Sequence, residues 1–346
     1  MKKIGMLTRY SSLGASSRYR FYKYIMPLLR YGYDVEVSPF FDDEYLNRLY
    51  SRRRVGYRHI LHCYWRRLAA LWHSGRELLI EYELFPLVPW LVEKCFLHRK
   101  KYILNFDDNV WEKYRRRPWL RNKYNRLAER AEGVIVANEY LYRKVRRLND
   151  NVIKVPTALD PEPYQEPAEK FARFTLIWIG TPITYRYIRE FAPMFQELAR
   201  QIDYELLIVA RKELELDAIR GVNMRFLTWS EEGESLILPK AHVGIMPLVR
   251  DAFSRGKSAF KILQYFAAGI PAVASPVGEN RYVIDDGRNG FLPHNDAEWI
   301  ARIVALHDDP ALYSRIAAES AASADEYSLE TWIPEVINFI ERTFKP

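Results

Sequence analysis

The most informative stretch of the sequence is RGKSAFKILQYFAAGIPAVAS, from Arg255 to Ser275. A polar, basic loop leads into a helix that ends in small residues. Gly269 suits the left-handed position that terminates a helix, and Pro271 stops the helix ahead of an apolar strand. The first turn of such a helix offers backbone N–H groups and the positive end of the helix dipole, and Lys257 or Lys261 would add charge. The stretch predicts a helix start that holds a diphosphate.

Apolar strands alternate with amphipathic helical segments on both sides of this stretch, which predicts parallel βαβ units with helices on both faces of the sheets. The strands are expected at 3–8, 34–38, 78–82, 102–106, 133–137, 174–179, 206–209, 224–227, 243–246 and 272–274.

The length of 346 residues favours two lobes, and a Pro-rich polar segment at 156–167 separates the two runs of strands. We expect a first lobe over 1–160 and a second over 168–327. The tail 328–346 is apolar at helical spacing and is expected to pack back on the first lobe.

The decisive stretch resembles the donor-binding segment of GT-B fold glycosyltransferases, in particular the retaining enzymes of family 4. Those carry two glutamates eight positions apart, the second followed by small residues, Gly, an apolar residue, Pro and a Val-rich strand. Gln264 stands at the second glutamate position and Gly256 at the first, so this chain departs from the family at both. It is similar to a subgroup with Lys three residues before the second position, here Lys261.

Two further stretches extend the resemblance. AHVGIMPL at 241–248 is similar to the family's short strand ending in Pro, and DDGRNGFL at 285–292 resembles its downstream turn. The resemblance implies an α/β chain of GT-B architecture, with two Rossmann-like, doubly wound parallel-sheet lobes facing a cleft. The second lobe is then expected to bind a nucleotide-sugar and the first lobe an acceptor.

The resemblance also implies roles for residues of the second lobe. Gln264 is expected to accept from the nucleotide ribose, as the family glutamate does. The loop 180–186 is expected to bind the diphosphate through Arg186, for which the alternative is a solvated surface arginine. The full set expected at the donor is Gly14, Gly180, Thr181, Arg186, Pro247, Lys257, Ser258, Phe260, Lys261 and Gln264.

Carboxylates stand at strand ends of the first lobe. Asp107 and Asp108 close the strand 102–106, where open α/β sheets bind ligands. With Lys261 they are the candidate catalytic residues, as ligands of sugar hydroxyls, as a base for the acceptor or as aids to a metal. The alternative is that they cap the next helix, and we expect one of the two to do so.

Less specific signals surround this pair. Glu81 and Glu83 end the preceding strand, and Glu83 is a candidate acceptor contact, although one of the two could instead pair with surface arginines. Arg18 begins a helix, where a cation opposes the helix dipole, which makes it a candidate for substrate phosphate. Arg20 is equally well interpreted as a surface residue.

Positive charge is concentrated in the first lobe. The segment from Arg48 to Arg147 holds 24 Lys and Arg against 10 Asp and Glu, whereas the whole chain has a net charge of +8. Such a surplus attracts nucleic acid, anionic lipid or a pyrophosphate substrate. The segment 57–72 mixes aromatic, apolar and basic residues at helical spacing, which is typical of a helix in a membrane interface, or else of a core-packed helix with solvated arginines.

Several classes of protein are disfavoured. The two cysteines, Cys63 and Cys95, and the seven histidines show no metal-ligand spacing, and no P-loop or nucleic-acid motif occurs. We expect no essential metal, no tightly bound cofactor and no nucleic-acid partner. No leader or membrane-spanning stretch is evident, which predicts a cytoplasmic protein, peripheral at the inner face of the membrane.

The expected function is therefore transfer of a sugar, with retention, from a UDP- or GDP-sugar to a lipid-linked or polysaccharide acceptor. We expect it to serve surface-glycan synthesis of a bacterial type, such as that of lipopolysaccharide, as a monomer or weak dimer. The missing glutamate at Gly256 leaves a second hypothesis open, a non-catalytic sugar- or membrane-binding partner. A GT-B fold epimerase or phosphorylase is a third.

Overall fold

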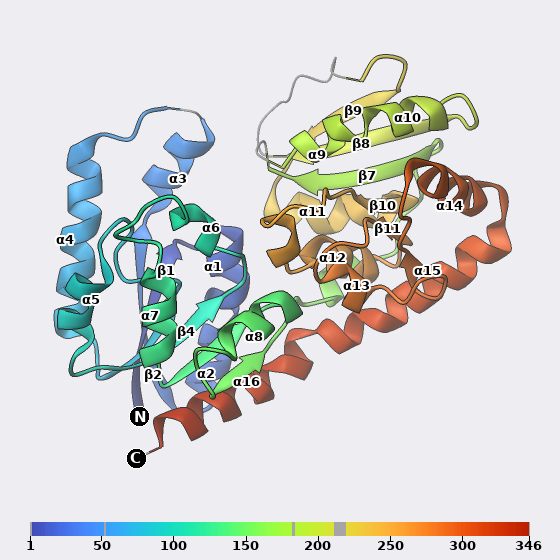
Figure 1. The fold of residues 1–346 in the computed structure, drawn as a ribbon. Coiled ribbons are helices and arrows are strands. Elements are labelled where there is room, and N and C mark those ends of the chain that lie inside the picture. The colour runs from blue at the N-terminus through green and yellow to red at the C-terminus, as the bar shows by residue number, and fades with distance from the viewer. Residues whose placement is uncertain (1, 52, 182–183, 211–218, 346) are drawn as a thin grey trace. The chain divides into compact units, whose positions relative to one another are not determined.

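The computed structural model describes residues 2–345 except 52, 182–183 and 211–218, and its chain divides into two units. Unit 1 comprises Met1–Ala158, Gly256–Ser258 and Glu330–Pro346, and unit 2 comprises Leu159–Arg255 and Ala259–Leu329. Figure 1 labels the helices and strands of each.

Unit 1 is built on a six-stranded parallel sheet in the order β2-β1-β3-β4-β5-β6. Its strands are β1 (Lys2–Tyr10), β2 (Tyr33–Phe41), β3 (Glu77–Glu81), β4 (Lys101–Phe106), β5 (Gly133–Val136) and β6 (Val152–Lys154). Its helices are α1 (Ala15–Arg20), η1 (Tyr22–Tyr24), α2 (Ile25–Arg30), α3 (Asp43–Tyr50), α4 (Tyr57–His73), α5 (Trp90–Leu97), α6 (Trp111–Tyr114), α7 (Lys123–Arg130), α8 (Glu139–Val145) and α16 (Leu329–Phe344).

The strands of unit 1 are apolar on both sides, as a sheet covered on both faces requires. Leu78, Ile80 and Leu104 pack with residues of α4, α5, α7 and α8 in one core. Leu79 and Ile103 point to the opposite face, where they line a small space with residues of η1, α2 and α16. Helix α16, the last in the chain, therefore closes the second face of the sheet.

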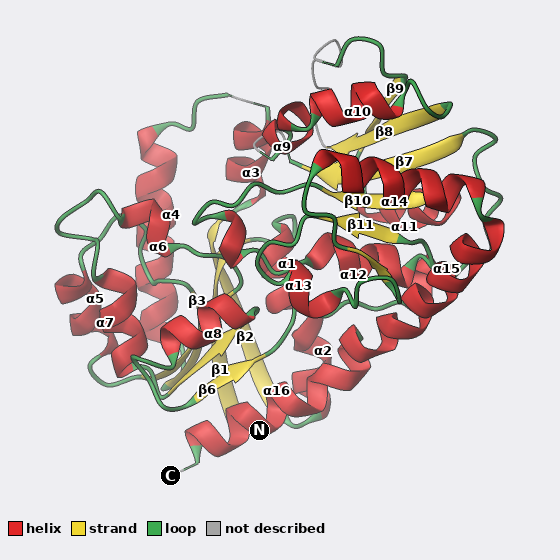
Figure 2. Ribbon diagram, turned by 45° about the vertical axis from the view of Figure 1, so that its right-hand side comes forward, coloured by secondary structure: helices red, strands yellow, loops and turns green. Residues whose placement is uncertain are grey.

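Unit 2 repeats this plan with strand order β12-β11-β10-β7-β8-β9, again all parallel (Figure 2). Its strands are β7 (Phe174–Gly180), β8 (Tyr204–Ala210), β9 (Met224–Thr228), β10 (Val243–Met246), β11 (Ala272–Ala274) and β12 (Gly290–Phe291). Its helices are η2 (Glu162–Tyr164), α9 (Arg186–Glu190), α10 (Ala192–Leu198), α11 (Glu231–Ile237), η4 (Leu238–Lys240), η5 (Ser254–Gly256), α12 (Phe260–Ala267), α13 (Asn280–Val283), α14 (Asp296–Asp308), α15 (Pro310–Ala324) and η6 (Asp325–Tyr327). The last residue of η5, Gly256, belongs to the 256–258 segment of unit 1.

Helices cover both faces of this sheet too. Residues of α9, α10 and α14 pack on one face, around Trp178 of β7 and Trp299 of α14. On the other face α12 lies close to β10: the Tyr265 hydroxyl donates to the Ile245 carbonyl at 3.1 Å, and Gly244 leaves room for the Tyr265 ring. This packing fixes α12 against the centre of the sheet.

The predicted fold class is confirmed. All ten expected strands are present within a few residues of their predicted ends, and the amphipathic tail forms α16 on unit 1. Gly269 adopts φ +62° just after α12, as the expected helix end requires.

One detail differs from expectation, because the turn predicted at 285–292 contains the short strand β12. The segment after the loop 180–186 forms two helices, since Pro193 stands in the first turn of α10 and prevents a continuous run. Within the described residues, no helix combines the length and the apolar character needed to span a membrane.

Candidate functional site

The start of α12 lies where the sequence predicts an anion-binding helix start. Helix α12 begins at Phe260, directly after Ala259, a buried residue with φ +54°. A left-handed conformation is costly for a residue with a Cβ and is often found at functional sites. Lys261 lies in the first turn of α12, and its Nζ is 5.9 Å from the centre of the Trp178 ring of β7.

Gln264 is buried in the middle of α12, with 2 % of its surface exposed. Its amide nitrogen donates to the carboxylate of Glu234, and it lies 3.3 Å from the hydroxyl of Tyr164. The amide nitrogen of Gln264 is therefore already bound within unit 2, which leaves its oxygen as the atom available to a ligand.

The loop after β7 carries Arg186 at the first position of α9. Arg186 Nη2 donates to Asp251 Oδ2 and to the Tyr187 hydroxyl, each at 3.0 Å. Its side chain is 44 % exposed, so a ligand can reach the guanidinium. Thr181 is exposed and its N–H donates to Thr184 Oγ1 at 3.1 Å, whereas Pro182 and Ile183 of the same predicted loop lie outside the described residues.

Strand polarity brings these unit 2 residues to one edge of the sheet. Gly180 ends β7, and Pro247 follows β10 as a buried residue. The next N–H, that of Leu248, donates to Ser275 Oγ at 2.8 Å, which ties the carboxyl ends of β10 and β11 together. The loop 247–259 then leads to α12, so Phe260, half-buried like Ser258, also stands at this carboxyl edge. Parallel sheets bind ligands at that edge.

The segment Gly256–Ser258 belongs to unit 1. Lys257 Nζ lies 3.0 Å from Asp108 Oδ2, and the Gly256 carbonyl accepts from Asn138 Nδ2 at 2.8 Å. A Cβ at position 256 would lie 2.3 Å from the Cβ of Asn109. No side chain fits there, which is a steric reason for the absence of a glutamate at this position.

Asp107 is buried at the carboxyl end of β4. The hydroxyl of Tyr82 donates to Asp107 Oδ1, and Tyr82 itself has φ +64°. Burial, together with the neighbouring Asp108, raises the pKa of Asp107 to about 6. The prediction that Asp107 or Asp108 caps the next helix is wrong: α6 has Val110 at its N-cap and no side-chain cap bond.

Glu81 lies beside this group at the end of β3. Its Oε2 accepts from Ser17 Oγ at 2.6 Å and from the Arg9 N–H at 2.7 Å. Burial, with the charge of Asp107, raises its pKa to about 7. Two carboxyl groups with raised pKa values thus stand at adjacent strand ends, an arrangement that can exchange protons near neutral pH.

Glu83, in contrast, is the centre of a buried ionic cluster. Its two oxygens accept from five side chains, with Lys123 Nζ nearest at 2.7 Å. Burial pushes its pKa up, but the cations around it outweigh burial and hold the pKa below its usual value. The donors are Arg9, Lys113, Tyr114, Lys123 and Tyr124. The expectation that Glu83 contacts the acceptor is corrected, because its oxygens are occupied by structural partners.

Gly14 has a packing role at the start of α1. A Cβ there would lie 2.5 Å from the Cβ of Tyr10. Arg18, four residues on, is buried rather than solvated: its Nη1 donates to the Ser12 carbonyl at 3.2 Å, and its guanidinium lies 5.0 Å from the Tyr19 ring centre. Both residues therefore help to order the loop between β1 and α1.

Arg20 is also buried, so its interpretation as a surface residue is wrong. It donates to Asn105 Oδ1 at 2.9 Å and to the carbonyls of Val155 and Pro156 at 2.7 and 2.8 Å. Arg20 thus joins the end of β4 to the segment that follows β6.

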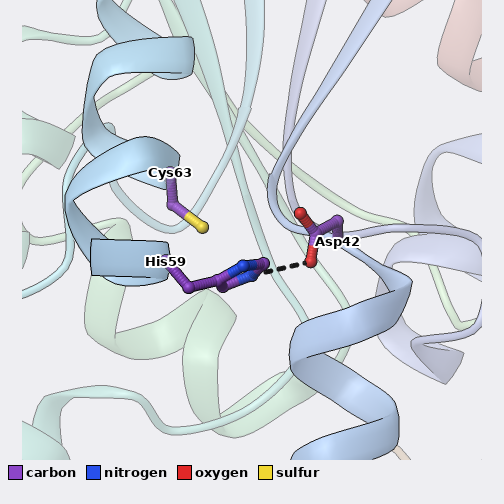
Figure 3. Close-up of side chains that lie close together, drawn as sticks. All are labelled: Asp42, His59 and Cys63. Carbon is purple, nitrogen blue, oxygen red and sulfur yellow. Dashed lines mark hydrogen bonds and ion pairs between the residues drawn. The ribbon is translucent and has the colours of Figure 1, made fainter. Parts of the chain in front are cut away.

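One cluster of possible metal ligands occurs in the described part of the chain. Asp42, His59 and Cys63 place their ligand atoms within 4.8 Å of one another, with His59 and Cys63 one turn apart on α4 (Figure 3). Asp42 already accepts from the N–H of Tyr45 as the N-cap of α3, and its other oxygen lies 3.1 Å from the guanidinium of Arg66. Burial raises the pKa of the Cys63 thiol, which disfavours the thiolate that metals bind.

Helix α4 combines a buried and an exposed apolar side. Cys63, Arg67 and Leu71 face the core of unit 1, so the helix is packed on the core as the alternative expects, although Arg67 is buried and not solvated. A second stripe points outward, with Trp72 87 % and Trp65 66 % exposed. The stripe consists of Tyr57, Leu61, Trp65, Leu68 and Trp72.

Some residues of interest carried no usable sequence signal. Tyr82 is the last residue of a predicted strand, but in the structure it lies beyond β3 with a positive φ, and its hydroxyl donates to Asp107. Asp251 and Glu234 are far in sequence from Arg186 and Gln264, which they hold.

A family model matches part of the chain. Residues 173–309 match the family model described as glycosyl transferases group 1, and all of this segment except Gly256–Ser258 belongs to unit 2. No curated protein matches the sequence.

Solved structures share the fold over nearly the whole chain. Sucrose-phosphate synthase from Thermosynechococcus elongatus is 13 % identical with a TM-score of 0.72, and each chain is covered to 99 %. HepE from Anabaena, solved in complex with UDP and glucose, is 14 % identical with a TM-score of 0.72, covering 99 % of this chain and 100 % of its own. A glycosyltransferase from Rickettsia africae is 10 % identical with a TM-score of 0.68, and each chain is covered to 99 %. At such identities the likeness establishes the GT-B fold, and with the family match it supports a glycosyltransferase.

Proposed function

We propose that this chain, which has the GT-B fold and a glycosyl transferases group 1 segment at residues 173–309, transfers a sugar from a nucleotide-sugar to an acceptor hydroxyl with retention of configuration. One observation carries the proposal. The family match covers the carboxyl edge of the unit 2 sheet, where Arg186, Pro247 and the first turn of α12 occur together.

Unit 2 is the proposed donor-binding unit. Arg186 and Lys261 neutralise the diphosphate, helped by backbone N–H groups around Thr181 and at the start of α12, while Gln264 accepts from the ribose. The same cations stabilise the nucleoside diphosphate as it leaves, which is the largest electrostatic contribution to such a reaction. UDP and GDP are the proposed nucleotides, and HepE, a structural neighbour, was solved with UDP.

Unit 1 contributes the proposed acceptor chemistry. Asp107 has a pKa of about 6, so it is largely ionised at neutral pH and can accept a proton or a hydrogen bond from an acceptor hydroxyl. Lys257 is paired with Asp108 at 3.0 Å, which holds a cation beside the carboxylates. Arg18 and Gly14 order the neighbouring loop. No step requires a metal or a resident cofactor.

The proposed acceptor is lipid-linked or a growing polysaccharide of a bacterial surface glycan, met at the cytoplasmic face of a membrane. Two features of unit 1 support this. The outward stripe on α4 exposes two tryptophans and a tyrosine, residues that favour the bilayer interface. Between Arg53 and Lys101 no acidic side chain is exposed, since Glu81, Glu83 and Glu93 are buried and Glu77 is half-buried. The exposed basic residues there are Arg53, Arg54, Arg58, Arg76, Lys94, Arg99 and Lys101. A monomer or weak dimer suffices for this role.

The deciding experiment is a thermal-shift screen against UDP-, GDP-, ADP- and TDP-sugars, followed by NMR of the product made from the best donor. A ligand at a hundred times its Kd adds about 2.7 kcal/mol of stability, which a shift in Tm reveals. A product whose anomeric configuration is the same as that of the donor sugar agrees with retention. An inverted product contradicts it.

The steric closure at Gly256 favours a second candidate, a non-catalytic sugar-binding partner, because no acidic side chain can stand there. Calorimetric binding of a nucleotide-sugar with no turnover on any lipid-linked acceptor would favour that candidate. Consumption of the donor without any acceptor would point instead to an epimerase or phosphorylase.

A further inference from the structure

The carboxylate of Glu234 gathers three hydrogen-bond donors from three separate segments of unit 2. Glu234 lies on α11 and is buried, with 6 % of its surface exposed. It accepts from the Tyr164 hydroxyl of η2 at 2.9 Å, from the indole N–H of Trp229, which follows β9, and from the amide nitrogen of Gln264 on α12. All three partners present a donor to Glu234, the arrangement that an ionised carboxylate requires because it only accepts hydrogen bonds.

This requirement decides which way the Gln264 amide points. Its nitrogen must face Glu234, and the Tyr164 hydroxyl lies 3.3 Å from the same nitrogen. The amide oxygen is therefore directed away from the cluster, and within the described residues it has no hydrogen-bond donor. A backbone or side-chain flip of the amide would set two oxygens against each other and cost the buried carboxylate a partner.

The same geometry explains an amide at position 264. A glutamate there would place a second carboxylate at hydrogen-bond distance from Glu234, and two buried like charges cannot both ionise at that distance. Glutamine keeps the oxygen and replaces the second charge with a donor. The identity of residue 264 is thus coupled to Glu234, a residue 30 positions earlier in the chain.

We propose that Glu234 is the positioning residue of the nucleoside half of the donor site: by binding the amide nitrogen of Gln264 and the indole N–H of Trp229, it fixes an acceptor oxygen and an aromatic ring toward the nucleoside. This rests on the proposed function. Trp229 stands at the carboxyl end of β9, on the same edge of the sheet as the start of α12. The oxygen of Gln264 suits a ribose hydroxyl, and the ring of Trp229 suits a base.

The test compares UDP with 2′-deoxy-UDP, and GDP with 2′-deoxy-GDP, by calorimetry on the full chain. We expect the wild-type protein to prefer the ribonucleotide by about three- to tenfold, the discrimination of one uncharged hydrogen bond. Glu234→Gln should bring the ratio close to one, because a glutamine there cannot accept from all three donors and leaves the Gln264 amide free to turn. Glu232→Gln removes the same charge from an exposed position of α11 and should keep the wild-type ratio.

Exchange of the two residues provides the second measurement. Gln264→Glu should bind UDP and GDP more weakly than the wild-type protein at neutral pH. The double variant Glu234→Gln with Gln264→Glu should recover both this affinity and the preference for the ribonucleotide, since an amide donor again faces a carboxylate. The double variant retains one charge and one amide, so it serves even where a single variant fails to fold.

Two outcomes overturn this inference and separate it from the proposed function. A folded Glu234→Gln variant with the wild-type ratio, or an exchange variant that folds but recovers no discrimination, refutes the role of Glu234 alone. A wild-type protein that binds neither UDP nor GDP refutes the proposed donor, and the role of Glu234 with it.

Discussion

Arg186 and Asp251 form an ion pair across the carboxyl edge of the unit 2 sheet, with Nη2 of Arg186 3.0 Å from Oδ2 of Asp251. Asp251 in turn accepts from the N–H of Ser254 at 2.6 Å through its other oxygen. Asp251 thus holds the guanidinium of Arg186 through one nitrogen, and the side chain of Arg186 remains partly exposed. Such an arrangement keeps a cation ready for a diphosphate, because little side-chain freedom is lost on binding.

Replacement of this arginine should weaken binding of the diphosphate and leave binding of the nucleoside unchanged. We expect Arg186→Ala to raise the Kd for UDP by about tenfold or more, as expected for a lost charge-assisted hydrogen bond, with the Kd for uridine unaltered. Calorimetry with UDP and uridine measures both. Arg189→Ala, one turn further along α9 and also exposed, is the control. An equal rise in the Kd for UDP in both variants would show that the positive charge of α9 attracts the diphosphate at a distance, without a direct contact from Arg186.

Lys261 should act on the leaving group. We expect Lys261→Met, which keeps the length of the side chain and removes the charge, to lower kcat by roughly 10²–10³, about 3–4 kcal/mol of transition-state stabilisation. Lys261→Arg retains the charge and should recover part of the rate. Steady-state kinetics with the best donor from the screen separates kcat from KM. A variant with wild-type kcat/KM removes Lys261 from the mechanism.

The fall in activity on the acidic side of the pH–rate profile, its acidic limb, should follow the protonation of Asp107. Its pKa of about 6 means that activity falls as the pH drops through 6, when the carboxylate takes up a proton and can no longer act as a base. Asp107→Asn should abolish this limb along with most activity.

A change at Tyr82 provides a second test of the assignment of the acidic limb to Asp107. Its hydroxyl donates to Asp107, a bond that favours the ionised form. Tyr82→Phe should therefore raise the pKa of Asp107 and move the acidic limb to higher pH, by about one unit. Tyr124→Phe removes another buried hydroxyl, one that contacts Glu83 instead, and should leave the limb in place. An unmoved limb in Tyr82→Phe would mean that another group controls the profile.

The stripe on α4 should insert at a membrane surface. Trp65→Ser with Trp72→Ser should lower partitioning onto phosphatidylcholine vesicles that contain phosphatidylglycerol by at least about tenfold, because two large apolar side chains are lost from the interface. Co-sedimentation measures the bound fraction. Tyr282→Ser removes an exposed aromatic residue from unit 2 and should have no effect. Wild-type protein that binds anionic and neutral vesicles equally weakly would refute membrane docking.

The fold follows from patterns that can be recognised in the amino-acid sequence. Strands such as 174–179 are continuous apolar runs that only a sheet covered on both faces can bury, and Gly269 with Pro271 marks the end of α12 through backbone geometry alone. These are local properties, and each follows from a few neighbouring residues. The residues at the carboxyl edges were found in the same way, because the end of a parallel strand indicates where its next residue lies.

The contacts of those residues, in contrast, could not be predicted from their positions in the sequence. Glu83 and Asp107 look alike in sequence as acids at strand ends, yet Glu83 meets Lys123 at 2.7 Å whereas Asp107 meets a tyrosine and a second carboxyl group. The partner of Gln264 is 30 positions away on another helix. Such contacts join segments brought together by the packing of whole elements, and the charge, burial and hydrogen bonds that set a side chain's chemistry depend on them.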